Sequence, residues 1–405
     1  MSKYLISQRF KWAWFQPHLF RKEEVSMKRF IFLLAFLWLL VLPIWVQGAA
    51  KPAMEHNAMI IGWDGAHRNH VKALLKEGRL PNLQKLVSEG ALVDIDVTSG
   101  ATDTKAGWTQ ILTGYKPEIT GVYSNARFRD VPEGYSIFER LKTQYGKDNI
   151  AAVSVIGKKG HCGEIDPPFK KPLDQVQDQE KEDRNRRKKP MQPGATEKRY
   201  QTVEENGVKY VVFNGSPYYT MHKSCDEWHF GLMKDAAVGD KTLGMLDKYG
   251  KKPFFFFVHF AEVDHSGHQH GEKSKEYDDA IISNDAQLGR LVAKLKELGV
   301  YDNTWIYVTA DHGFDVGERS HKRAPYVFLG TNDKQVMRNG TRADIAPTVL
   351  DRVGIDLGKI SPSLDGGSLA QPATKSTGIS ALPFLGSFAA RLLDAPGSGD
   401  ATRRR

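Results

Sequence analysis

Short, almost wholly apolar segments recur along this chain and alternate with longer segments whose apolar residues have helical spacing. The clearest is the run Phe-Phe-Phe-Phe-Val at 254–258, which suits a strand buried on both faces of a sheet. We expect strands at 58–63, 91–97, 150–156, 253–260, 304–310 and 326–329, and helices at 67–76, 82–89, 105–112, 136–145, 242–249, 277–298 and 344–353. This alternation predicts an α/β fold, with a doubly wound, mostly parallel sheet and helices on both faces.

The N-terminal residues have the pattern of an export signal. Lys28 and Arg29 precede an uninterrupted apolar run at 30–46, and small residues follow at 48–50. We expect 27–49 to be a signal peptide or a retained anchor that attaches the chain to a membrane through 30–46, after a basic extension at 1–26. Either alternative places the domain in the periplasm or outside the cell. Cys162 and Cys225 could pair there or stay free, but two cysteines exclude a disulfide scaffold.

The formal net charge of +9 is concentrated at the chain ends and in one polar segment. Residues 1–29 carry +5, residues 169–199 carry +4 and the arginines at 403–405 carry +3, which leaves −3 for the rest. A folded basic groove is therefore not expected, nor is a nucleic-acid partner. The segment 169–199 breaks the alternation, so we expect a solvated insert or surface loop, a small cap within a folded domain at 50–370. Residues 371–405 are expected to form a C-terminal tail.

Three predicted strands end in an aspartate, and two of these ends also carry a histidine. One aspartate after a strand is typical of a turn or a helix cap. Because the carboxyl ends of parallel strands meet at one edge of a sheet, three such ends favour a shared site. Carboxylate and imidazole groups are ligands for zinc, with manganese as the alternative. The candidate ligands are Asp64, Asp264, His268, Asp311, His312 and the later His321.

Thr104 precedes the predicted helix at 105–112. A hydroxyl at this position is usually an N-cap. A helix N-terminus also favours anions, and a hydroxyl beside a divalent cation ionises and attacks more readily. Thr104 is therefore a candidate nucleophile as well as a candidate cap.

Taken in order, these motifs resemble those of the alkaline phosphatase superfamily, and most closely its nucleotide pyrophosphatase/phosphodiesterase-like enzymes. The resemblance covers about 58–369. The segment Ile-Ile-Gly-Trp-Asp-Gly at 60–65 is similar to the first metal strand, and Thr104 has the family's nine-residue spacing to Thr113-Gly114. The segments at 264–268 and 311–313 are similar to two metal motifs, and 343–350 is similar to a late structural helix.

The resemblance implies a role for each residue. Thr104 would be the nucleophile of a phosphothreonine intermediate, and Asn125 would donate to a phosphoryl oxygen, as would backbone N–H groups at the start of the 105–112 helix. The implied reaction is hydrolysis of phosphodiester or nucleotide pyrophosphate bonds in a small phosphate ester. Two divalent ions, most simply zinc, would be held by Asp64, Thr104, Asp311 and His312 and by Asp264, His268 and His321. A threonine at 104 argues against a sulfatase, which converts a cysteine or serine to an aldehyde.

A phosphomonoesterase of the alkaline phosphatase type, or a phosphonate hydrolase, on the same site is the first alternative. Added basic residues would favour it, and Lys158, Lys159 and Lys105 are the candidates. The simpler interpretation, which we expect to hold, is that they are solvated loop lysines. A mutase of the superfamily would carry a large inserted domain and stay in the cytoplasm. A non-catalytic exported protein that binds anions or nucleic acid would lack ligands, whereas every expected ligand type is present.

Overall fold

A computed structural model describes residues 51–186 and 201–372 of the chain. The predicted N-terminal extension, the signal or anchor at 27–49 and nearly all of the tail lie outside the described residues. Within the described ranges, no helix combines the length and the apolar character needed to cross a bilayer.

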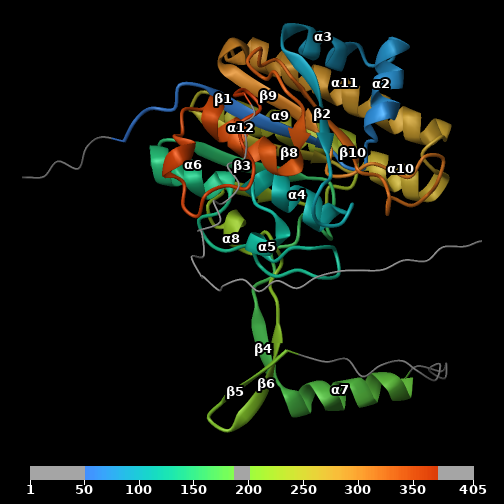
Figure 1. Ribbon diagram of the computed structural model, residues 1–405, viewed down its shortest axis with the longest axis vertical. Coiled ribbons are helices and arrows are strands. Elements are labelled where there is room, and N and C mark those ends of the chain that lie inside the picture. Colours follow the sequence, from blue (N-terminus) through green and yellow to red (C-terminus); the bar gives the residue numbers. More distant parts are fainter. Residues whose placement is uncertain (1–50, 187–200, 373–405) are drawn as a thin grey trace, which may run out of the picture. The chain divides into compact units, whose positions relative to one another are not determined.

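An eight-stranded sheet forms the centre of the fold, in the order β11-β2-β10-β9-β1-β8-β3-β7 (Figure 1). Strand β10 is antiparallel to both of its neighbours, and the other pairings are parallel. The predicted fold class is therefore confirmed. The strands are β1 (Asn57–Trp63), β2 (Ala91–Asp96), β3 (Ala151–Ile156), β7 (Glu227–His229), β8 (Phe254–Phe260), β9 (Thr304–Thr309), β10 (Tyr326–Thr331) and β11 (Gly340–Thr341).

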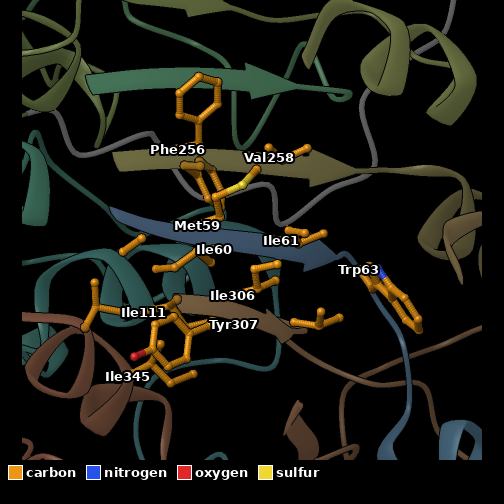
Figure 2. Close-up of a cluster of buried hydrophobic side chains, with 14 of the residues drawn as sticks. Met59, Ile60, Ile61, Trp63, Ile111, Phe256, Val258, Ile306, Tyr307 and Ile345 are labelled. Carbon is orange, nitrogen blue, oxygen red and sulfur yellow. The ribbon is translucent and has the colours of Figure 1, made fainter. Parts of the chain in front are cut away.

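The middle strands are apolar along their whole length because both faces of the sheet are covered. Every residue of β1, β3 and β8 is buried. Figure 2 shows Met59, Ile60 and Ile61 of β1 between Phe256 of β8 and Ile306 of β9. This dry core holds the carboxyl ends of the adjacent parallel strands in register, and these ends carry the candidate site.

Helices cover both faces of the sheet (Figure 1). Helix α11 packs against α3, α9 and α10, whereas α12 packs against α4 and α6. The bounds are α2 (Arg68–Lys76), α3 (Pro81–Glu89), α4 (Thr104–Thr113), α5 (Pro117–Thr120), α6 (Ile137–Tyr145), α8 (Tyr219–His222), α9 (Asp235–Tyr249), α10 (Glu262–His270), α11 (Lys275–Glu297) and α12 (Ile345–Arg352), with 3₁₀ turns η1 (Tyr301–Asn303), η2 (Arg342–Asp344) and η3 (Leu357–Lys359). Helix α9 begins at Asp235, well before the predicted 242. The prediction missed these first turns because Gly239 and Gly244 weaken the helical pattern of the sequence.

Of the two expectations for 169–199, a solvated insert or a surface loop, the described part forms an insert with secondary structure and mostly exposed residues, not a loop. Residues 169–186 form β4 (Phe169–Pro172) and α7 (Leu173–Arg186). Strand β4 belongs to a second, three-stranded antiparallel sheet of order β4-β6-β5, with β5 (Thr202–Glu205) and β6 (Val208–Phe213). The sequence showed no helix there because α7 is almost wholly polar and has no apolar stripe. We call β4, α7, β5 and β6 the arm.

Candidate metal and nucleophile site

Four adjacent parallel strands, β9-β1-β8-β3, each deliver a charged side chain to the same edge of the sheet. Asp311 follows β9, Asp64 follows β1, and Lys158 follows β3. Asp264 comes after β8 and lies inside helix α10, which was not among the expected helices. Parallel strands place all their carboxyl ends at one edge, so residues far apart in the sequence meet there.

The acidic and imidazole side chains gather into two groups that suit metal ions. Asp64, Asp311 and His312 offer ligand atoms within 4.8 Å of one another, and so do Asp264, His268 and His321. Asp264 Oδ1, Asp311 Oδ2 and His312 Nε2 are buried without a hydrogen-bond partner among the described residues. Burying such polar atoms unpartnered is costly, so their convergence fits divalent cations. The two groups consist of the residues that were expected as candidate ligands, and Thr104 Oγ1 lies 3.0 Å from Lys158 Nζ between them.

Thr104 is the first residue of α4, and it is 2% exposed. Asp103 precedes it as the N-cap, since its side chain accepts a hydrogen bond from the backbone of Ala106. Helix α4 packs very closely on the site at Gly107, where an added Cβ would lie 2.5 Å from Asp311 Cβ. Glycine at 107 therefore lets helix α4 approach Asp311, a candidate metal ligand.

Helix α10 and the loop after β9 carry the second group. Asp264 and His268 are one helical turn apart on α10, so both side chains reach the same side. His268 Nδ1 lies 3.0 Å from the Arg319 carbonyl oxygen, and His321 Nδ1 contacts the Thr102 carbonyl oxygen. Such bonds orient an imidazole and leave its other nitrogen for a ligand role. Burial, reinforced by His312, lowers the pKa of His321 to about 4, so its ring is neutral as metal binding requires.

Lys158 lies at the centre of the site, and the prediction of a solvated loop lysine is wrong for it. Its Nζ is 2.8 Å from Asp64 Oδ1, 2.8 Å from Asp264 Oδ2 and 3.0 Å from Thr104 Oγ1. Lys159 is exposed, as expected. Lys105 is buried, and its ammonium lies 3.5 Å from the Glu164 carboxylate. The expectation of a solvated loop lysine is therefore wrong for Lys105 as well.

The charges at this edge shift the titration of the buried carboxyl groups. Burial raises the pKa of Asp64, but Lys158 and then His259 outweigh it and hold that pKa well below its usual range. Burial and the charge of Asp64 raise the pKa of Asp311 well above its usual range. Burial lowers the pKa of Lys158, but the carboxylates of Asp264 and Asp64 outweigh it and raise that pKa. The crowding of like carboxylates is a second sign of a cation site.

The structure adds functional candidates that the sequence did not reveal. His259, fully buried in β8, lies with Nε2 2.7 Å from Asp64 Oδ2. Arg342, in η2, is fully buried and donates to backbone carbonyls of Asp311 at 2.9 Å and Ala101 at 3.1 Å. A histidine inside an otherwise apolar strand was a signal for the first. Nothing in the local sequence distinguished the arginine.

The remaining predicted residues are distributed as follows. Asn125 Oδ1 accepts a hydrogen bond of 2.8 Å from the Lys105 backbone N–H, so this N–H already has a protein partner instead of being open to a phosphoryl oxygen. This bond uses only the amide oxygen of Asn125, so the NH₂ group of the same side chain can still donate to a phosphoryl oxygen.

His265 and His270 are exposed on α10, and neither belongs to the two groups of candidate ligands. Cys162 and Cys225 are both free thiols.

The sheet has the mostly parallel arrangement that was expected from the resemblance to the alkaline phosphatase superfamily. Residues 58–359 match the family model described as type I phosphodiesterase/nucleotide pyrophosphatase, and the chain belongs to this family of hydrolytic enzymes. The recognition made from the motifs is thereby confirmed.

Individual relatives cover smaller parts of the chain. It is 34% identical over 166 residues to the 2,3-bisphosphoglycerate-independent phosphoglycerate mutase of Natronomonas pharaonis, covering 38% of this chain and 31% of that protein. It is 22% identical over 269 residues to the bis(5'-adenosyl)-triphosphatase of Bos taurus, covering 66% of this chain and 49% of that one. The chain thus spans less than half the length of either relative. The solved lipoteichoic acid synthase LtaP of Listeria monocytogenes aligns with a TM-score of 0.48 and 17% identity, covering 80% and 76% of the two chains.

Proposed function

We propose that this chain is a metal-dependent hydrolase that cleaves phosphodiester or nucleotide pyrophosphate bonds in small-molecule substrates, with Thr104 as its nucleophile. The observation that carries the proposal is the contact of Thr104. Its Oγ1 lies 3.0 Å from Lys158 Nζ, which itself lies 2.8 Å from one carboxylate of each ligand group. Lys158 thus connects the hydroxyl to a carboxylate of each group, and this position suits an attacking oxygen.

The protein residues have distinct roles in this reaction. Thr104 Oγ1 attacks phosphorus in line with the ester oxygen that leaves, and water then hydrolyses the resulting phosphothreonine. The positive end of α4 and the NH₂ group of Asn125 stabilise charge on the non-bridging oxygens. Two divalent ions, zinc in our proposal and manganese as the alternative, would supply Lewis acidity at the attacking and leaving oxygens. Their ligands would be Asp64, Thr104, Asp311 and His312 for one, and Asp264, His268 and His321 for the other.

Lys158 supports a second candidate function, hydrolysis of phosphomonoesters. A monoester carries one more negative charge than a diester, and an ammonium group beside the nucleophile offsets this charge. Lys158 meets this requirement through its 3.0 Å contact with Thr104, whereas exposed Lys159 does not. The two candidates share every other residue, so relative turnover of the two esters separates them.

Location and organisation complete the proposal. We propose that 27–49 exports the chain or anchors it to a membrane, and that 50–370 is the catalytic domain. Its partners would be small phosphate esters and not nucleic acid, because the excess of basic residues belongs to 1–29, 169–199 and 403–405 of the sequence, and the rest of the chain has a net charge of −3.

Replacing the nucleophile tests the proposal. Purified protein, supplied with zinc or manganese, is assayed with bis(p-nitrophenyl) phosphate and p-nitrophenyl phosphate. We expect Thr104→Ala to abolish turnover of both while its circular dichroism spectrum stays native, and Thr104→Ser to retain part of it. Thr202→Ala, at an exposed threonine of β5, is the matched control and should turn over normally. Near-normal turnover by Thr104→Ala would refute the proposal.

A further inference from the structure

The side chain of Arg342 is completely buried, although it carries a charge. In the described part of the chain it bonds only to backbone carbonyl oxygens, through four hydrogen bonds to three of them. Its Nε is buried without a partner among the same residues. Burying a charge without a bonded counter-charge is costly, so this position requires an explanation beyond packing.

The guanidinium joins two segments that carry residues of the candidate site. Nη2 donates to the Ser99 carbonyl at 2.6 Å, and Nη1 donates to the Ala101 carbonyl at 3.1 Å and to the Asp311 carbonyl at 2.9 Å. Ser99 and Ala101 lie in the segment that leads into α4, whose first residue is Thr104. Asp311 follows β9 and is a candidate metal ligand. One side chain thus ties the backbone before Thr104 to the backbone of a ligand.

The segment before α4 depends on a few such bonds for its path. Residues 97–103 form neither helix nor strand, so their backbone groups need partners outside a regular ladder. The Ser99 carbonyl also accepts from Gln110 Nε2 at 2.9 Å, and the Ala101 N–H donates to the Tyr123 carbonyl at 2.8 Å. Because a guanidinium is planar and rigid, its bonds fix the carbonyls relative to one another.

The turn that presents Arg342 is itself well anchored. Asp344 Oδ2 accepts hydrogen bonds from the Thr341 backbone N–H at 2.7 Å and from the Thr341 hydroxyl at 2.8 Å, which is a capping box for η2. Thr341 pairs with Asp96 of β2 in the main sheet. The strand order β11-β2-β10-β9 places two strands between this turn and the carboxyl end of β9. The long arginine side chain therefore connects the sheet's edge to the site.

We propose that Arg342 is a positioning residue, which holds Thr104 and Asp311 at the separation that attack on phosphorus requires. Its bonds go to backbone carbonyls, so it acts through these two residues and does not touch the substrate. This inference rests on the proposed function and adds to it a residue outside both ligand groups.

Two substitutions of Arg342 test the role. Arg342→Lys keeps a positive charge but not the planar fork, and Arg342→Met removes both. For whichever p-nitrophenyl ester the wild type turns over faster, we expect Arg342→Lys to lower kcat by about 10- to 100-fold with KM unchanged, because small misplacements of reacting groups cost this much. Arg342→Met should lose more. Zinc affinity, measured by competition with a chromophoric chelator, should fall by about tenfold in both, since the peptide of Asp311 is no longer held.

Arg338 provides the matched control, because its guanidinium makes the same kind of bond away from the site. It donates to the carbonyl oxygens of Gly367 and Ser368 at 3.0 Å each, and it lies 3.4 Å from Asp344. Arg338→Met removes these contacts and leaves those of Arg342 in place. We expect it to lower the free energy of unfolding in urea while kcat and zinc affinity stay at the wild-type values.

The outcomes separate this inference from the proposed function. Wild-type turnover with unchanged kcat and zinc affinity in Arg342→Lys overturns the positioning role and leaves the proposed function intact. A loss of kcat in Arg338→Met as large as that in Arg342→Lys also overturns it, because general destabilisation then explains both. A wild-type protein that turns over neither ester refutes the proposed function and the positioning role with it. If Arg342→Met does not fold, Arg342→Lys, which retains the charge, decides the test.

Discussion

His259 Nε2 lies 2.7 Å from Asp64 Oδ2, and both side chains are completely buried. The carboxylate accepts this bond, so one oxygen of Asp64 is fixed and the other, Oδ1, faces Lys158 and His312. Strand pairing makes this relationship, because β1 and β8 are neighbours and Gly62 pairs with His259. His259 thus orients a candidate metal ligand without being one.

We predict that His259→Ala weakens metal binding. Partners that orient ligating carboxylates typically contribute about 10- to 100-fold to metal affinity. His259→Gln keeps a donor and should lose less. Competition with a chromophoric chelator measures the affinity. His265→Ala, at an exposed histidine of α10, is the control, and metal affinity equal to wild type in His259→Ala would contradict the assigned role.

Because Lys158 contacts Thr104, we predict that Lys158→Met lowers kcat/KM by an amount that depends on the substrate. Loss of a single charged donor beside the nucleophile is expected to reduce kcat/KM by about 100-fold for a monoester. The loss should be smaller for a diester, which has less charge to neutralise. Parallel assays with both p-nitrophenyl esters measure the ratio, with exposed Lys159→Met as control. Equal losses on both esters would argue against a role in charge recognition.

Asp235 predicts a pH dependence of stability. It accepts backbone hydrogen bonds from Ala261 at 2.8 Å and Glu262 at 3.2 Å at the start of α10, but burial raises its pKa to about 7. The unfolded chain releases this proton near pH 4, so between about pH 4 and 7 the folded state binds the extra proton. Stability from this group is therefore present at low pH and is lost as pH rises, by up to about 1.4 kcal/mol per pH unit.

Asp235→Asn removes this titration. We expect the free energy of unfolding of the variant, relative to wild type, to rise between pH 5 and pH 8, as measured by urea denaturation at each pH. Asp240→Asn, at an exposed acid on the same helix, should show no such trend. Parallel curves for Asp235→Asn and wild type would show that Asp235 titrates normally.

Gly→Ala substitutions at Gly107 and Gly244 test how closely helix α4 packs, because the first position is crowded and the second is open. A Cβ at Gly107 would lie 2.5 Å from Asp311 Cβ and 2.7 Å from its carbonyl oxygen, whereas nothing lies within 4 Å of one at Gly244 in α9. Gly107→Ala should destabilise the fold by about 1–3 kcal/mol and reduce turnover, because helix α4, which carries the proposed nucleophile, must shift. Gly244→Ala should stabilise it by about 0.5–1 kcal/mol, since alanine favours a helix. Urea denaturation measures both, and a stable, fully active Gly107→Ala would contradict the packing argument.

The α/β architecture could be predicted because its signals are local. Apolar runs such as 254–258 identify strands buried on both faces, and an aspartate after each of three strands places ligands at one edge of any parallel sheet. The arm could not be predicted in this way, because α7 has no apolar stripe and β4 pairs with β6 across a long separation in sequence.

The pattern of apolar runs and strand-end residues was enough to determine the fold class, the family and the two sets of candidate ligands, since each depends on short segments and their order. The tertiary structure alone decided what surrounds them. Lys158 reaches Thr104, and His259 reaches Asp64, only because β9, β1, β8 and β3 lie side by side in that order. Strand order is a long-range property of packing, and spacing along the chain does not encode it.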